Sequence, residues 1–184
     1  MTIDQYPTEI AQLLQSAQIC PLGPGKPVQE AYAQLSSLSV NSLSERALRD
    51  RSMAEACLSG LWLRFNYLDQ SHTISQDLPD STGSYWHGIM HRREPDYSNA
   101  KYWFRRTGDH PAMEILADKV KLFVTEVKLD RVTQFLAEGT WDPMAMVDAC
   151  EAVARGNCAK QELLEKVAQS EWETLFEYCY SRAF

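Results

Sequence analysis

Apolar residues recur at three- and four-residue spacing over most of the chain, and this period is typical of amphipathic α-helices. The pattern predicts a helix after Pro7, a short helix over residues 28–38, and a long core helix that starts at Ser42 or Ser44 and ends near Leu68. No segment alternates apolar and polar residues over the length of a strand. The sequence therefore predicts an all-α fold.

The middle of the chain is predicted to form a helical hairpin over residues 84–107. Pro95 disfavours helical geometry at the residue before it, so the first helix of the hairpin ends near Glu94. Asp96 is a candidate N-cap for the second helix, and Gly108 is placed to close it. These signals make the hairpin the best-delimited part of the pattern.

The remaining helices are predicted from two prolines at helix starts and from one long run of regularly spaced apolar residues. Pro111 and Pro143 each follow a candidate capping residue, and the last helix carries apolar residues at regular spacing over residues 163–179. The polar segment 69–81 is predicted to connect two helices. Helices of such different lengths favour a single irregular, orthogonal array of about seven to nine helices, forming one domain over residues 1–184.

The N-terminal part is separated from the rest by a break. Residues 21–27, PLGPGKP, hold three prolines and two glycines, which interrupt regular structure. We interpret this segment as a linker after a helix within residues 1–20. That helix is either an arm or part of the core, and the sequence alone leaves both alternatives open.

Charge and cysteine usage narrow the class of protein. The chain has 184 residues and a formal net charge of −7, which argues against nucleic acid as a partner, because phosphate neutralisation needs a basic face. No apolar run is long enough to span a bilayer, and the N-terminus lacks the features of a signal peptide. Five scattered cysteines without a CxxC motif fit free thiols in a reducing compartment. We therefore expect a cytoplasmic protein.

Candidate chemistry is concentrated between Tyr85 and Pro111. This stretch holds three of the four histidines, and its five basic residues outnumber its three acidic ones. It therefore carries a local charge of +2 within an acidic chain. A small positive patch of this kind is typical of a site for a small anion rather than for a polyanion. The remaining histidine, His72, lies in a polar segment and is expected to face solvent.

His87 and His91 are spaced to share one face of a helix, where two imidazoles can bind one metal ion. Glu94 is the nearest candidate for a third ligand, and the metal would be a zinc-like divalent ion. Position 88 is glycine, so the glutamate of an HExxH motif is missing. The alternative is that both histidines make polar contacts in a helix interface. No other cofactor is predicted.

The same stretch supplies groups for acid–base chemistry and for anion binding. Histidine is the side chain whose ordinary pKa lies nearest neutrality, and arginine binds carboxylates and phosphates through its planar fork. The candidate catalytic residues are His87, His91 and His110. The candidate ligand-binding residues are Arg92, Tyr97, Lys101, Arg105 and Arg106.

The stretch YWHGIMHRREPDYSNAKYWFRR, together with the later WDPMAMVDACE and EWETLFEYCY segments, resembles a family of uncharacterised, hypothetical proteins. The resemblance covers about half of the chain, from Tyr85 onward. It implies no activity, cofactor or catalytic residue. Any functional prediction therefore comes from the residues themselves.

Two hypotheses follow from the sequence. In the first, a pocket at the central hairpin binds a small anionic or polar molecule, and the protein is either a binding protein or an enzyme of the hydrolase or lyase type. In the second, the protein is a non-catalytic interaction module, and the His, Arg and Asp side chains of the hairpin form a structural network. A pocket with His87 and His91 facing it favours the first hypothesis, and complete pairing of the arginines with carboxylates favours the second.

Overall fold

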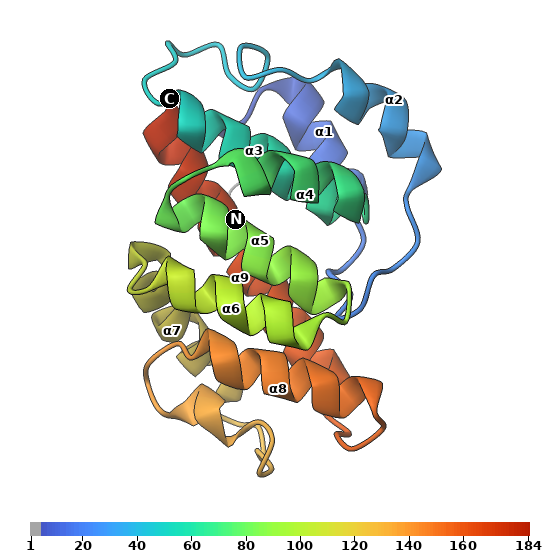
Figure 1. Ribbon diagram of the computed structural model, residues 1–184, viewed down its shortest axis with the longest axis vertical. Helices are drawn as coiled ribbons and strands as arrows, with labels where there is room; N and C mark the ends of the chain where they lie inside the picture. Colours follow the sequence, from blue (N-terminus) through green and yellow to red (C-terminus); the bar gives the residue numbers. More distant parts are fainter. Residues whose placement is uncertain (1–4) are drawn as a thin grey trace.

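The computed structural model describes residues 5–184, and within this range the chain is all-α, as predicted. It contains nine α-helices and a short 3₁₀ helix, arranged as an irregular array (Figure 1). The helices are α1 (Thr8–Ser16), α2 (Gln29–Ser37), α3 (Arg51–Arg64), α4 (Leu68–Asp77), α5 (Ser81–Arg93), α6 (Tyr97–Thr107), α7 (Pro111–Val124), α8 (Pro143–Ala154) and α9 (Gln161–Ala183). In the described part of the chain, no helix is both long and apolar enough to cross a membrane.

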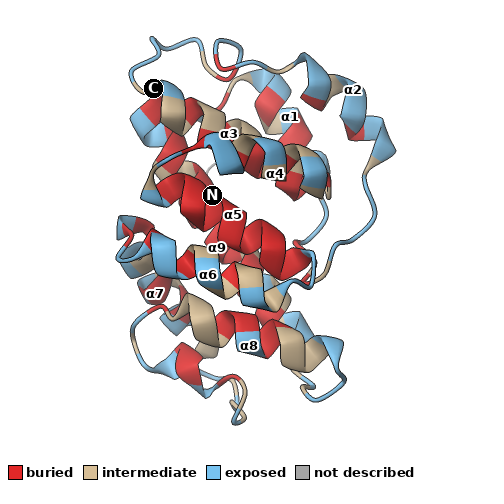
Figure 2. Cartoon of the chain, viewed as in Figure 1, coloured by how far each residue is buried: buried red, intermediate tan, exposed pale blue. Residues whose placement is uncertain are grey.

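Helix α5 lies at the centre of the array. It packs against α3, α4 and α6, and α6 in turn packs against α8. Every residue from Thr82 to Arg93 is buried, so α5 is enclosed on all sides (Figure 2). A helix that is buried on all sides has no solvent-facing side on which its polar residues could lie. Its polar residues are therefore inside the protein. The histidines and arginines of α5 (His87, His91, Arg92 and Arg93) are therefore core residues.

Two glycines let the helices around α5 approach closely. A Cβ atom at Gly88 would lie 2.9 Å from the ring of Phe104 on α6, and one at Gly60 of α3 would lie 2.8 Å from the ring of Trp86. Both distances are shorter than the ordinary contact between carbon atoms, about 3.5–4.0 Å. Because the two glycines have no side chain, aromatic rings of neighbouring helices pack directly against their backbone.

Helix α9 runs behind α3 and the central hairpin in the view of Figure 1 and joins the two halves of the chain. It packs against α3, α7 and α8. The indole Nε1 of Trp172 donates to the carbonyl oxygen of Gly60 at 2.8 Å, and the hydroxyl of Tyr180 donates to the carbonyl oxygen of Leu43 at 3.2 Å. The ring of Trp172 also stacks on Phe176. Aromatic residues spaced along α9 therefore bury its inner face.

Several predicted helix ends are confirmed by their capping geometry. The carboxylate of Asp96 accepts from the backbone N–H of Asn99, and Gly108 ends α6 with a φ of 59°. Asp142 accepts from two backbone N–H groups at the start of α8, where the proline occupies the first helical position. These ends were predictable because capping depends on neighbouring residues alone.

The segment before α5 differs from the prediction. The long helix expected from Ser42 or Ser44 to Leu68 is shorter, because α3 starts only at Arg51 behind the N-cap Asp50 and ends at Arg64. Asn66, with a φ of 67°, cannot continue a helix and turns the chain back.

The polar segment 69–81, expected to be a connection, mostly forms α4. Its buried positions are Ser71 and Ser75. Because serine is not hydrophobic, the buried face of α4 cannot be recognised from the spacing of apolar residues. Helix α5 likewise starts earlier than expected, at Ser81, behind the N-cap Asp80.

The N-terminal segment is tied to the core by side chains that the pattern did not reveal. Helix α1 buries Ile10, Leu13 and Leu14. The guanidinium of Arg93 donates to the backbone carbonyl oxygens of Gly23 and Pro24, within the 21–27 segment, at 3.1 and 3.0 Å. These contacts fix the Pro/Gly segment against the end of α5. Residues 1–4, which belong to the predicted 1–20 helical segment, lie outside the described residues.

Candidate functional site

Three histidines meet where α4 packs against α5. His72 of α4 lies beside His87 and His91 of α5, and one ring nitrogen from each of the three lies within 4.8 Å of the others. The ring centroids of His72 and His87 are 4.5 Å apart, and those of His87 and His91 are 4.7 Å apart. The two α5 histidines share a face because they are one turn apart. We call these three residues the histidine cluster.

His87 is oriented by a serine of α4. Its Nδ1 lies 3.1 Å from the hydroxyl of Ser75, which also lies 3.2 Å from the carbonyl oxygen of His72. When Ser75 donates to that carbonyl, it accepts from Nδ1–H of His87 and the lone pair is on Nε2. In this tautomer Nε2 is the nitrogen available to a metal ion.

His91 is held by two other groups. Its Nδ1 lies 3.0 Å from Oε2 of Glu94, and a carboxylate accepts only, so Nδ1 carries the hydrogen and Nε2 carries the lone pair. The side-chain nitrogen of Asn99 lies 3.0 Å from Nε2 and 3.5 Å from Nδ1. Asn99 therefore donates on the side of the ring that carries the lone pair.

Burial keeps the two α5 imidazoles neutral. Desolvation, reinforced by the charges that His91 and His72 would carry, lowers the pKa of His87 to about 3. Desolvation also lowers the pKa of His91, although Glu94 opposes this shift. Neutral imidazoles are the form that binds metal ions. The two α5 histidines therefore present unprotonated nitrogen donors at neutral pH.

The donor set fits a zinc-like ion. Nitrogen ligands at the Zn–N distance of about 2.0–2.1 Å lie roughly 3.4 Å apart around a tetrahedral ion, so the three nitrogens would close by about an ångström. His72 is half-buried and its rotation is the simplest adjustment. Three histidines and one remaining position are the arrangement of a catalytic rather than a closed structural zinc site.

Glu94, predicted as a third ligand, takes a different place. Its side chain is 49% exposed and accepts from Nδ1–H of His91, and it is not part of the group of converging ring nitrogens. A carboxylate at this place orients a histidine ligand and raises its basicity. The third nitrogen of the cluster comes from His72 instead.

His110, predicted as a catalytic residue, lies at the other end of α5 and has a capping role. Its Nδ1 accepts from the backbone N–H of Ala112 at 3.2 Å, so its Nε2 carries the hydrogen and donates to the hydroxyl of Thr82 at 3.1 Å. Desolvation lowers the pKa of His110 to about 4. Both nitrogens are occupied by structural contacts.

Arg92, predicted to bind ligand, is buried in an ion pair with Glu171 of α9. The side chains of Arg92 and Glu171 are 2% and 0% exposed. Among the described residues, Nη1 of Arg92 and Oε1 of Glu171 find no hydrogen-bond partner. The pair links α5 to α9 and is closed to solvent, as the structural-network hypothesis expects for this residue.

The other predicted ligand-binding residues do not converge on one point. Tyr97 is half-buried, and Lys101 forms an ion pair with Asp148 of α8. Arg105 and Arg106 are exposed on α6. Of these residues, Arg106 alone is tied to the histidine cluster, through the ring of Trp103.

His72 was missed by the sequence reasoning, which expected it to face solvent. It is half-buried and its ring contacts both His87 and His91. The signal that places it there is the buried pair Ser71 and Ser75 on the same side of α4. Small polar residues at four-residue spacing predict a buried face only once the neighbouring helix is known.

Comparison with known proteins adds no functional information. A scan against protein-family models, a search of curated proteins and a search of solved structures found no match to this chain. Assignment of a function therefore depends on the geometry of the histidine cluster and its surroundings.

Proposed function

We propose that the protein binds a divalent transition-metal ion, with zinc as the best fit to the donors, at the histidine cluster. The observation that carries the proposal is the convergence of three imidazole nitrogens within 4.8 Å of one another in the core of a helical array. The ligands are His72, His87 and His91. Ser75 and Glu94 contact Nδ1 of His87 and of His91 respectively, and so orient the two α5 rings.

The open coordination position favours reactive chemistry over a purely structural role. A zinc ion with three histidine ligands lowers the pKa of a bound water to about 7, which is the chemistry of a metal-dependent hydrolase or lyase. In this chain, Asn99 contacts His91 of the cluster, and the half-buried His72 and exposed Glu94 are the parts of the surroundings that reach solvent. The ring of Trp103 lies 4.0 Å from that of His87 and shields it.

The wider context of the proposal follows from charge and thiols. Five free cysteines fit a reducing compartment, so we place the protein in the cytoplasm. The net charge of −7 supports a small molecule rather than nucleic acid as the partner. The alternative function is an interaction module, which the buried pairing of Arg92 with Glu171 favours.

A zinc titration of the purified chain tests the proposal. Isothermal titration calorimetry of the metal-free protein is expected to give one zinc per chain. His72→Ala should weaken binding at least tenfold, because it removes one of three ligands and lies at the half-buried rim, where the fold tolerates truncation. His87→Ala and His91→Ala should do the same.

The fourth histidine provides the matched control. His110→Asn keeps an acceptor at the N-cap of α7 and lies outside the cluster, so its zinc affinity should equal that of the wild type. Circular dichroism of each variant separates loss of a ligand from loss of the fold. Absence of zinc binding by the folded wild type, or equal loss in folded His110→Asn and His72→Ala, would overturn the proposal and leave the interaction module as the working model.

A further inference from the structure

A stripe of side chains on α6 borders the histidine cluster. Asn99, Trp103 and Arg106 are spaced by four and three residues, so they lie on one face of the helix. Asn99 contacts His91, and the ring of Trp103 lies against that of His87, with 4.0 Å between centroids and 33° between planes. The stripe therefore leads from the cluster along the surface of the protein.

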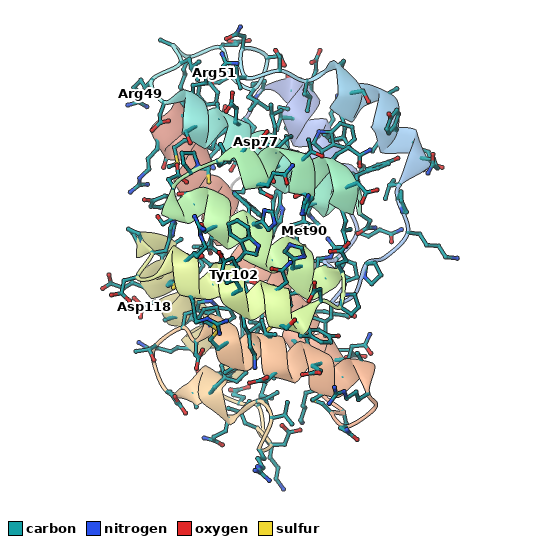
Figure 3. The ribbon with its side chains drawn as sticks, in the orientation of Figure 1. Arg49, Arg51, Asp77, Met90, Tyr102 and Asp118 are labelled. Carbon is teal, nitrogen blue, oxygen red and sulfur yellow. The ribbon has the colours of Figure 1, made fainter. Side chains whose placement is uncertain are left out.

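Arg106 lies at the outer end of this stripe. Its guanidinium is 5.0 Å from the centroid of the Trp103 ring, and it donates to the hydroxyl of Tyr102 at 3.3 Å. Tyr102, labelled in Figure 3, is 46% exposed on α6. Arg106 is itself exposed, and these contacts involve a phenol and two aromatic faces rather than a carboxylate. Its charge is therefore positioned by the aromatic rings without being neutralised by them.

Three of the other four cations of the hairpin differ from Arg106 in this respect. Arg92 is paired with Glu171, Lys101 is paired with Asp148, and Arg93 is saturated by backbone carbonyls and Asn66. Arg105 is exposed but lies about 100° around the helix from Arg106. A guanidinium that lies over an aromatic ring and is not paired with a carboxylate still has N–H groups with which to hold a carboxylate or a phosphate.

We propose that the metal site takes a small anionic molecule whose charged end binds Arg106 while its other end reaches the histidine cluster across the ring of Trp103. This inference rests on the proposed metal site and names the class of its substrate. Arg106 contacts the ring of Trp103, and that ring contacts the ring of His87. The two ends of a ligand that reaches both residues are therefore several bonds apart. Short dicarboxylates and phosphorylated compounds of similar length have this form.

Binding of dicarboxylates to the zinc-loaded chain tests the inference. The probes are succinate, glutarate and adipate, each compared with the monocarboxylate in which a methyl group replaces one carboxylate: butyrate, pentanoate and hexanoate. At least one dicarboxylate is expected to bind about tenfold more tightly than its partner, the gain typical of a charge-assisted hydrogen bond. In Arg106→Gln this gain should disappear.

Arg105→Gln is the matched control, because it removes the same charge from the neighbouring position. The gain should persist in this variant. Zinc is titrated into all three proteins first, so a failure to bind zinc overturns the metal site itself and is recognised before any acid is added. If zinc binds, the inference is overturned when no dicarboxylate outperforms its monocarboxylate, or when Arg105→Gln and Arg106→Gln reduce the gain equally.

Discussion

At the scale of single residues, hydrogen bonds divide the histidines into two kinds. His110 uses both ring nitrogens for structural contacts with Ala112 and Thr82. His87 and His91 contact Ser75 and Glu94 through Nδ1, and the one contact at Nε2 is that of His91 with the amide of Asn99. Residue type alone does not separate these roles, since all three residues are buried.

Asn99 competes with the metal for the lone pair of His91. Replacement of Asn99 by alanine removes a hydrogen bond worth about 1 kcal/mol, so zinc affinity should rise about fivefold. Ser98→Ala, which alters a neighbouring contact with Asp96, should leave the affinity unchanged. Calorimetric titration of both variants makes the measurement. A weaker affinity in Asn99→Ala would mean that the asparagine is itself a ligand.

At the scale of elements, the packing of α5 against its neighbours positions the cluster. α5 meets α6 across Gly88, and the ring of Phe104 occupies the space that a side chain would fill. α5 meets α9 through the pair of Arg92 and Glu171. These two contacts fix the position of α5 along its axis and its rotation about that axis. They therefore also fix the positions of its histidines.

Gly88→Ala tests the first contact. Alanine is the better helix former by about 1 kcal/mol, but its Cβ would lie 2.9 Å from the Phe104 ring, and overpacking typically costs about 1–3 kcal/mol. We expect a net loss in the free energy of unfolding, measured by urea denaturation. Gly23→Ala, where nothing lies within 4 Å of the new atom, is the control. An increase in stability for Gly88→Ala would contradict the close packing described.

The second contact is tested by a double-variant cycle. Removal of one partner of a buried ion pair usually costs about 3–5 kcal/mol, because the other charge remains buried alone. Arg92→Leu and Glu171→Leu should each destabilise the protein by about this amount, and the double variant should be more stable than either. Denaturant unfolding gives all four values. Additive losses in the double variant would show that the two residues act independently.

At the scale of the whole molecule, buried neutral histidines make stability depend on pH. The folded-state pKa values of His87 and His110, about 3 and about 4, lie below the ordinary value of 6.5. The unfolded chain therefore binds more protons as the pH falls below about 6.5, and unfolding is favoured. By pH 5 the loss approaches about 2 kcal/mol for each residue.

Thermal unfolding between pH 7.5 and pH 4.5 checks this dependence. Stability should decline steadily below about pH 6.5, and the decline should be shallower in His110→Asn, which removes one of the two groups. The wild type and this variant are compared in the same buffers. A stability that stays constant down to pH 5 would contradict the burial of neutral imidazoles.

Features that depend on neighbouring residues in the chain were predictable from the sequence, and features that depend on tertiary packing were not. The caps of α6 and α8 and the all-α class followed from local signals. The predictions failed where polar side chains are buried: α4 hides two serines, and α5 has no exposed face to reveal its period. His72 reaches the cluster only because α4 folds back on α5.

The most direct measurement is a crystal structure of the chain grown with zinc, with the anomalous signal used to locate the metal. We predict one ion bound by one ring nitrogen each of His72, His87 and His91, at about 2.0–2.1 Å. Glu94 should remain on Nδ1 of His91, and Asn99 should have turned away from Nε2. An ion held instead by cysteines or surface carboxylates, or an empty cluster at saturating zinc, would contradict the account.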